Sequence, residues 1–343
     1  MRKEKPFKIL SVDGGGIKGL YSATVLANFE EEFNCLASDH FDLICGTSTG
    51  GLIALALSQK MPAKAICDFY KEHGGKIFPN RSKWFSWLEY LETKLFKGKF
   101  FFGQTLWHGK YKNEYLKKVL TDLFQEKTIG ESNNLLCVPS YCITEARPYI
   151  FKYDHTVLRR DNKTSYVDVA LATSAAPTYF PVHQIANHDN KQFVDGGVWA
   201  NNPTLVGLIE ALKYFVGEGK EYDSIQILSI SSLSASKGKP TGWKRNRSFI
   251  GWRSDLFDLP MNGQSEFTEY FMKTISELNH VPIEYVRVPS AVVSKEQLPL
   301  VDLDNACPNA LDLLSGKGND IGLEFRQNEK VKLFFKTPKS YNL

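Results

Sequence analysis

Apolar and polar residues alternate along the chain in blocks that predict strands followed by helices. The run KILSV at residues 8–12 has the apolar, β-branched composition of a buried strand, and a glycine-rich turn follows it. The next segment, LYSATVLANFEEEF, spaces its apolar residues as a helix does and leaves acidic residues for the other face. The same order recurs in FDLICG, a second buried strand, and in TGGLIALALSQ, a helix apolar enough to be buried on nearly every side.

Later apolar runs extend this order over most of the chain. We expect further strands at residues 135–144, 149–153, 192–194, 224–231 and 284–288. Strands that alternate with helices are typical of α/β proteins, in which helices cover both faces of a sheet. The sequence therefore predicts an α/β fold with a largely parallel central sheet.

Composition narrows the class of protein. The 343 residues are 43% hydrophobic, which is enough to bury a substantial core. The formal net charge of +4 permits an anionic partner without requiring one, and we expect neither DNA nor RNA as a partner. The six cysteines show no C-x-x-C or zinc spacing, so we expect reduced thiols and no metal or other cofactor. No apolar run approaches the roughly 18 residues of a membrane span, and the N-terminus lacks a signal-type segment, so we expect a cytoplasmic protein.

A serine stands in a tight glycine turn directly after the second predicted strand. Gly46, Ser48 and Gly50 form the pattern G-x-S-x-G, and a helix of small residues follows. In the nucleophile elbow of serine hydrolases the turn leaves no room for bulky neighbours, the serine Oγ projects above the sheet, and the helix N-terminus points at the site. This context predicts that Ser48 is a nucleophile, the alternative being an incidental tight turn.

The first turn, DGGGIKG, also fits the nucleotide-binding pattern G-x-G-x-x-G through Gly14, Gly16 and Gly19. A dinucleotide-binding fold needs an acidic residue at the end of the second strand, where this chain has the serine turn. A P-loop needs lysine and serine or threonine after the last glycine, where this chain has Leu-Tyr. In a serine hydrolase, the N–H groups of Gly14, Gly15 and Gly16 can instead converge on the oxyanion of a tetrahedral intermediate.

Two residues are candidates for the base that activates Ser48. His280 is the only histidine beyond Gly197 and would complete a triad, but its surroundings, ELNHVPIEYV, lack the turn residues of a catalytic loop. Asp195 ends a predicted strand and precedes Gly196 and Gly197, which allow a close backbone approach. A carboxylate that is hydrogen-bonded to a serine in a dry pocket can take the proton, and burial raises its pKa. We therefore expect Asp195 to be the base.

The motifs DGGGIKG, GTSTG and DGG, in this order, resemble those of the patatin-like phospholipase family, as does ATSAAPTYFP at residues 172–181. The resemblance covers about residues 7–230 and implies a patatin-type three-layer sandwich related to α/β hydrolases. It implies a Ser48–Asp195 dyad, an oxyanion hole at Gly14 to Gly16, and metal-free hydrolysis of the acyl esters of membrane phospholipids. Asp-Gly-Gly stands here where many members have Asp-Gly-Ala, a change that the turn should tolerate.

Two segments add to this catalytic domain of residues 7–230. Residues 80–110 are expected to form a cap insertion, and residues 231–343 a C-terminal extension packed on the same domain with a regulatory role. In the cap, residues 84–102 are rich in aromatic residues and lysines, and helical spacing is shown by Trp84, Trp87, Leu88, Leu91 and Leu95. This pattern indicates either a helix packed on the core or a face that touches lipid.

The extension begins with a basic stretch, residues 233–253, which contains six basic residues and no acidic one. Here Trp243, Lys244, Arg245 and Arg247 combine aromatic faces with cations, which can stack on bases and hold phosphates. Compact patatin-like proteins resemble effectors of bacterial antiphage defence that a cyclic dinucleotide activates. We therefore expect an effector site at this stretch, against the alternatives of a solvated basic loop or a second membrane contact.

Together these features predict a lipid acyl hydrolase of phospholipase A type that is peripheral at the inner membrane when active. The alternatives are a triad esterase for small soluble esters that uses His280, an unregulated lipase, and a silent ligand-binding protein. The intact Ser48 and Asp195 argue against the last of these. The sequence leaves open the head group, the sn-position and whether the protein forms a homo-oligomer.

Overall fold

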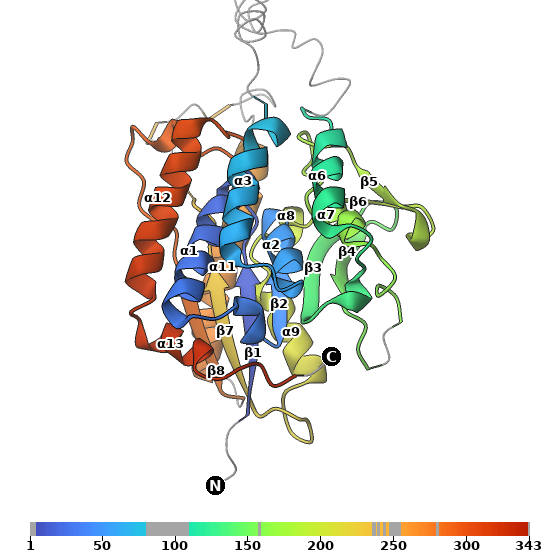
Figure 1. Cartoon of the computed structure of the whole chain (residues 1–343), viewed down its shortest axis with the longest axis vertical. Coiled ribbons are helices and arrows are strands. Elements are labelled where there is room, and N and C mark those ends of the chain that lie inside the picture. Colours follow the sequence, from blue (N-terminus) through green and yellow to red (C-terminus); the bar gives the residue numbers. More distant parts are fainter. Residues whose placement is uncertain are drawn as a thin grey trace, which may run out of the picture.

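The computed structural model describes residues 5–79, 110–156, 159–234, 238, 241–242, 245–246, 255–278 and 281–341. A sheet of eight strands forms its centre (Figure 1). The order along the sheet is β5-β6-β3-β2-β1-β7-β8, and β4 pairs with β3. The strands are β1 (Pro6–Val12), β2 (Leu43–Gly46), β3 (Leu135–Cys142), β4 (Arg147–Lys152), β5 (His183–Ile185), β6 (Lys191–Asp195), β7 (Ser224–Ile230) and β8 (Ile283–Val288).

The strands at the centre of this sheet and on one side of it pair with one another in parallel. β1 pairs in parallel with β2 and β7, β2 with β3, and β7 with β8. β4 and β6 run antiparallel to β3, and β5 runs antiparallel to β6. The largely parallel sheet predicted from the sequence is thus confirmed, and its antiparallel strands gather at one edge.

Helices cover both faces of the sheet, which gives the three layers of the predicted sandwich (Figure 1). One layer consists of α1 (Gly19–Phe33), α2 (Thr49–Ser58), α3 (Ala63–Ile77), α6 (Glu114–Phe124), α7 (Tyr166–Thr173), α12 (Pro308–Phe325) and α13 (Glu329–Phe335). The other consists of α8 (Gly197–Ala200), α9 (Thr204–Tyr214) and α11 (Asp255–Leu278).

The burial of both faces explains the apolar strands. In β1, Leu10 and Val12 belong to the core under the first layer, whereas Phe7 and Ile9 belong to the core under the second. A strand covered on both sides is apolar throughout rather than alternating. All ten residues of α2 are buried, as its sequence predicts.

Two details differ from the sequence prediction. The strand β5 was not expected, because three residues carry no recognisable period. The acidic residues of α1 were all expected on the exposed face, which is wrong for Glu30. This buried carboxylate accepts hydrogen bonds from the N–H groups of Ala37 (2.8 Å) and Ala63 (2.6 Å), so it ties α1 to two connecting segments.

The chain beyond residue 230 continues the same sheet and the same helical layer. Residues Ile225 to Ile230 of β7 pair in register with Ile283 to Val288 of β8. α12 lies along α1, where Gly318 and Gly322 leave space for Thr24 and Asn28. Within the described ranges, none of the helices combines the length and the apolar character that crossing a bilayer requires.

Candidate active site

Ser48 lies at the sharp turn between β2 and α2. Its backbone angles are φ 55° and ψ −123°, a left-handed region that residues other than glycine rarely adopt. A Cβ on Gly46 would collide with the Gly50 carbonyl, and a Cβ on Gly50 would collide with the carbonyl of Val12. The turn therefore requires both glycines, and it holds Ser48 at the N-terminus of α2.

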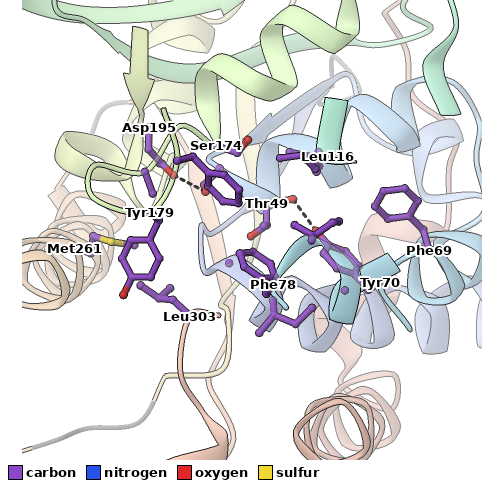
Figure 2. Close-up of a pocket in the computed structure, with 18 residues that line it drawn as sticks. Thr49, Phe69, Tyr70, Phe78, Leu116, Ser174, Tyr179, Asp195, Met261 and Leu303 are labelled. Carbon is purple, nitrogen blue, oxygen red and sulfur yellow. Dashed lines mark hydrogen bonds between the residues drawn. The ribbon is translucent and has the colours of Figure 1, made fainter. Parts of the chain in front are cut away.

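Ser48 forms a hydrogen-bonded pair with Asp195. The Ser48 Oγ donates to Asp195 Oδ2 at 2.7 Å (Figure 2), and the Gly197 N–H donates to Asp195 Oδ1 at 2.6 Å. Asp195 is the last residue of β6, and only β3 lies between β6 and β2 in the sheet. The sheet order thus brings together two residues that are 147 positions apart in the chain.

Burial changes the acidity of Asp195. Its side chain lies in the protein interior, and the loss of water raises its pKa to about 7. The hydrogen bonds from Ser48 and Gly197 act in the opposite direction but do not offset the burial. A carboxylate with a pKa near 7 is a far better proton acceptor than an exposed aspartate and is still ionised at slightly alkaline pH.

This pKa predicts the pH dependence of hydrolysis. Because a base must be unprotonated to accept a proton, kcat/KM on a neutral, soluble ester should rise about tenfold per pH unit up to pH 7 and level off above it. Initial rates between pH 5 and 9, with circular dichroism to verify folding at each pH, test this. A flat profile, or one that falls between pH 7 and 8, would contradict a base with this pKa.

The glycine loop Gly14–Gly16 passes beside the serine turn. The Gly14 N–H donates to the Asn201 carbonyl at 2.9 Å, so this amide already has an acceptor. The amides of Gly15 and Gly16 make no hydrogen bond to any other described residue. Gly16 has φ +60°, and a Cβ there would collide with the Leu303 carbonyl. The two amides available to an oxyanion are therefore those of Gly15 and Gly16.

The remaining motif glycines allow close packing around the pair. A Cβ on Gly19 would lie 2.6 Å from the Tyr70 hydroxyl. A Cβ on Gly196 would collide with the carbonyl of Pro139, and one on Gly197 would lie 3.0 Å from Asp195 Oδ1. Gly196 thus lets the chain pack against the backbone of β3, and Gly197 lets the Asp195 carboxylate approach its N–H.

A pocket with mostly apolar walls opens onto the Ser48–Asp195 pair (Figure 2). It encloses about 670 Å³ including its mouth. Its polar groups are few, and no histidine lines it among the described residues. Leu52, Phe69 and Tyr70 also line a smaller apolar pocket of about 250 Å³ including its mouth. The catalytic pocket is lined by Gly16, Ile17, Ser48, Thr49, Leu52, Phe69, Tyr70, Gly74, Ile77, Phe78, Leu116, Ser174, Ala176, Tyr179, Phe180, Asp195, Met261 and Leu303.

Sequence reasoning missed two residues that hold the site. The Thr173 hydroxyl accepts the Ser48 N–H at 2.9 Å and donates to the Pro139 carbonyl at 2.6 Å, which fixes the serine turn against β3. Asn201 accepts the Gly14 N–H through its backbone carbonyl, so it links the glycine loop to the segment after Asp195. Thr173 lies in the segment ATSAAPTYFP and Asn201 in residues 192–203, shortly after Asp195, but nothing in their spacing distinguishes them from their neighbours.

Several predicted positions lie outside the described residues. These are the cap residues 84–102, His280, and the effector candidates Trp243, Lys244 and Arg247. Of the effector candidates only Arg245 is described, and its side chain is exposed.

Comparison with known proteins identifies the family. Residues 10–208 match the model of the patatin-like phospholipase family. A cGAMP-activated phospholipase of Pseudomonas aeruginosa is 34% identical over 91% of this chain and 87% of its own length. A cGAMP-activated phospholipase of Vibrio cholerae is 28% identical over 96% and 95%, and Patatin-like protein 1 of Arabidopsis thaliana is 29% identical over 82% and 73%. The chain therefore belongs to the patatin-like phospholipase family of lipid ester hydrolases.

Proposed function

We propose that the protein hydrolyses the fatty-acyl esters of membrane phospholipids through a Ser48–Asp195 dyad. The observation that carries this proposal is the 2.7 Å hydrogen bond from Ser48 Oγ to Asp195 Oδ2 at the wall of an apolar pocket. Ser48 Oγ attacks the ester carbonyl while its proton passes to Asp195, and Asp195 returns the proton to the departing lysophospholipid alkoxide. Water that gives a proton to Asp195 then attacks the acyl-serine and releases the fatty acid.

The surroundings of Ser48 supply the other requirements of ester hydrolysis. The amides of Gly15 and Gly16 are proposed to donate to the carbonyl oxygen as it becomes negatively charged, and removing one such donor typically costs about 3 kcal/mol of transition-state stabilisation. The apolar walls fit an alkyl chain, because burial of each CH₂ group contributes about 0.8 kcal/mol.

We also propose that residues 7–230 form the catalytic domain, with residues 80–110 as its cap, and that residues 231–343 pack on it. β8 extends the sheet beside β7, and Met261 of α11 lines the catalytic pocket, which supports this arrangement. Phospholipid in a bilayer is the expected substrate, so the protein is proposed to bind peripherally at the inner membrane when active.

A cyclic dinucleotide is proposed to activate the enzyme in bacterial antiviral defence. The names of relatives that match this chain over nearly its whole length support this, because they are cGAMP-activated phospholipases. An enzyme able to cleave its host's own phospholipids must be held inactive until it is needed. The basic stretch around Arg245 is a proposed contact for the phosphates.

Activation is tested by fatty-acid release from phospholipid vesicles. We expect the purified protein to show little activity alone and at least a tenfold rise in activity with cGAMP. An effector that binds more tightly to the state with an open catalytic pocket increases the fraction of molecules in that state. The variant with Arg245→Glu and Arg247→Glu should need more nucleotide for the same rate. Equal activity with and without a panel of cyclic dinucleotides would mean that the protein is an unregulated lipase. Unchanged activation of the variant would mean that these arginines do not bind the nucleotide.

A further inference from the structure

A polar pocket lies at the carboxyl ends of three neighbouring parallel strands. Asp13 follows β1, Ser231 follows β7 and Pro289 follows β8, and all three line it. The strand order reverses at β1, because the chain continues to β2 on one side of it and later returns to β7 on the other. Ligands of open α/β sheets bind outside the carboxyl ends of the strands at such a point. The pocket encloses about 640 Å³ including its mouth, and its wall consists of Asp13, Asn201, Ser231, Ser232, Ser234, Asn262, Ser265, Glu266, Glu269, Arg287, Pro289 and Ser290.

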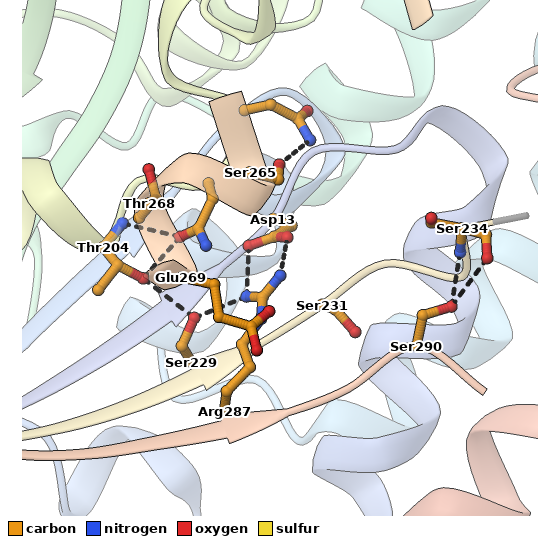
Figure 3. A network of polar contacts seen from close by, with 12 residues as sticks. Asp13, Thr204, Ser229, Ser231, Ser234, Ser265, Thr268, Glu269, Arg287 and Ser290 are labelled. Carbon is orange, nitrogen blue, oxygen red and sulfur yellow. Dashed lines mark hydrogen bonds and ion pairs between the residues drawn. The ribbon is translucent and has the colours of Figure 1, made fainter. Parts of the chain in front are cut away.

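Arg287 is the one cation among the described residues of this wall, and an ion pair within the protein balances its charge. Arg287 donates to both oxygens of Asp13, at 2.9 and 2.5 Å, and to the Ser229 hydroxyl at 2.7 Å (Figure 3). The wall also carries the carboxylates of Glu266 and Glu269, from α11. Glu269 pairs with Lys273 at 2.7 Å and with Arg287 at 3.9 Å, whereas the exposed Glu266 has no ion pair among the described residues. The wall therefore favours a ligand that donates hydrogen bonds.

Ser231 is a buried hydroxyl without a partner at this pocket. Its residue is 5% exposed, and its Oγ forms no hydrogen bond to any described residue. Figure 3 shows it between the Asp13–Arg287 pair and the hydrogen-bonded pair of Ser234 and Ser290. Buried polar groups in proteins are nearly always satisfied, so the unpaired Ser231 hydroxyl at this pocket wall is available to bond to a ligand.

We infer that this pocket binds the guanine base of a cyclic dinucleotide, an inference that rests on the proposed activation by such a nucleotide. Guanine carries adjacent N1–H and N2–H donors, which match the two oxygens of the Glu266 carboxylate. Adenine carries one amino group beside an acceptor nitrogen, which would face the same carboxylate. Ser231 donates to, or accepts from, the remaining polar edge of the base.

The position of the pocket explains how a base bound there can affect the catalytic site. Asp13 lines the polar pocket and directly precedes the glycine loop, while Gly16 lines the catalytic pocket. The helix α11 also lines both pockets, with Glu266 on the polar one and Met261 on the apolar one. A base bound to Glu266 and Ser231 therefore links α11, which also lines the catalytic pocket, to the end of β7, where the Asp13 N–H donates to the Ile230 carbonyl at 3.0 Å.

Binding of cGAMP to the full-length protein, measured by isothermal titration calorimetry, tests the inference. Ser231→Ala and Glu266→Gln should each weaken binding about tenfold or more, and cyclic di-AMP should bind the wild type at least about tenfold more weakly than cGAMP. Ser38→Ala is the matched control, because Ser38 Oγ is also buried without a partner among the described residues but lies outside the pocket. It should leave binding unchanged.

Stability and basal activity separate a binding defect from misfolding. Neither serine hydroxyl has a partner to lose, so Ser231→Ala and Ser38→Ala should both retain the wild-type melting temperature and nucleotide-free hydrolysis rate. If cGAMP binds both pocket variants as tightly as the wild type, or cyclic di-AMP binds as tightly as cGAMP, the pocket assignment is wrong while activation stands. If the wild type binds no cyclic dinucleotide, the proposed activation fails and this inference fails with it.

Discussion

Replacement of Ser48 by alanine or of Asp195 by asparagine should lower fatty-acid release from phospholipid vesicles by about 10,000-fold or more. Ser48→Ala removes the attacking oxygen. Asp195→Asn can still accept the hydrogen bond now made at 2.7 Å but cannot take the proton. Because the two residues act as one unit, the double variant should be no less active than either single variant. Rates are measured with saturating cyclic dinucleotide.

Two control variants distinguish the dyad from other arrangements. Ser174 lines the same pocket, but its hydroxyl donates to the Ala170 carbonyl at 2.6 Å, so Ser174→Ala should retain activity close to the wild type. His280→Ala should also retain most activity. Near-normal hydrolysis by Asp195→Asn would exclude the dyad, and an inactive His280→Ala would favour the triad.

Replacement of Arg287 by glutamine should lower the free energy of unfolding by about 3–5 kcal/mol. The side chains of Arg287 and Asp13 are 9% and 4% exposed, so the variant would leave the Asp13 carboxylate buried without its counter-charge. Urea denaturation followed by circular dichroism measures the loss. The double variant Asp13→Asn with Arg287→Gln should regain part of it, because a neutral amide needs no counter-charge.

A partly exposed ion pair provides the comparison for Arg287. The side chains of Arg326 and Glu32 are 28% and 30% exposed, and their atoms lie 3.1 Å apart. Arg326→Gln should therefore change the free energy of unfolding by at most about 1 kcal/mol. An Arg287→Gln variant as stable as Arg326→Gln would mean that water reaches Asp13 and screens the ion pair.

Local motifs explain how much of the site could be predicted from the sequence. The turn around Ser48 and the strand end at Asp195 are each encoded by adjacent glycines, so their geometry is readable from a few residues. Arg287 is not readable in this way, because it contacts Asp13 from 274 positions away. Thr173 and Asn201 act through single contacts across the fold, and the use of the Gly14 amide depends on one of them.

The fold shows the same division between local and distant information. Burial on both faces makes the parallel strands apolar, so their positions follow from composition. The order of strands, and the antiparallel edge that carries Asp195, depend on pairings between distant segments such as Ser140 with Asp195. No hydrophobic period encodes such a pairing.

Covalent trapping of the nucleophile tests the central claim most directly. The full-length protein, with cGAMP present, is incubated with a fluorophosphonate that carries a long alkyl chain, and peptide mass spectrometry locates the adduct. A serine activated by a base displaces the fluoride and becomes phosphonylated. The account predicts one adduct, on Ser48, that forms much more slowly in Asp195→Asn and is absent from Ser48→Ala. An adduct on another residue, or an unmodified Ser48 in protein that hydrolyses phospholipid, would contradict it.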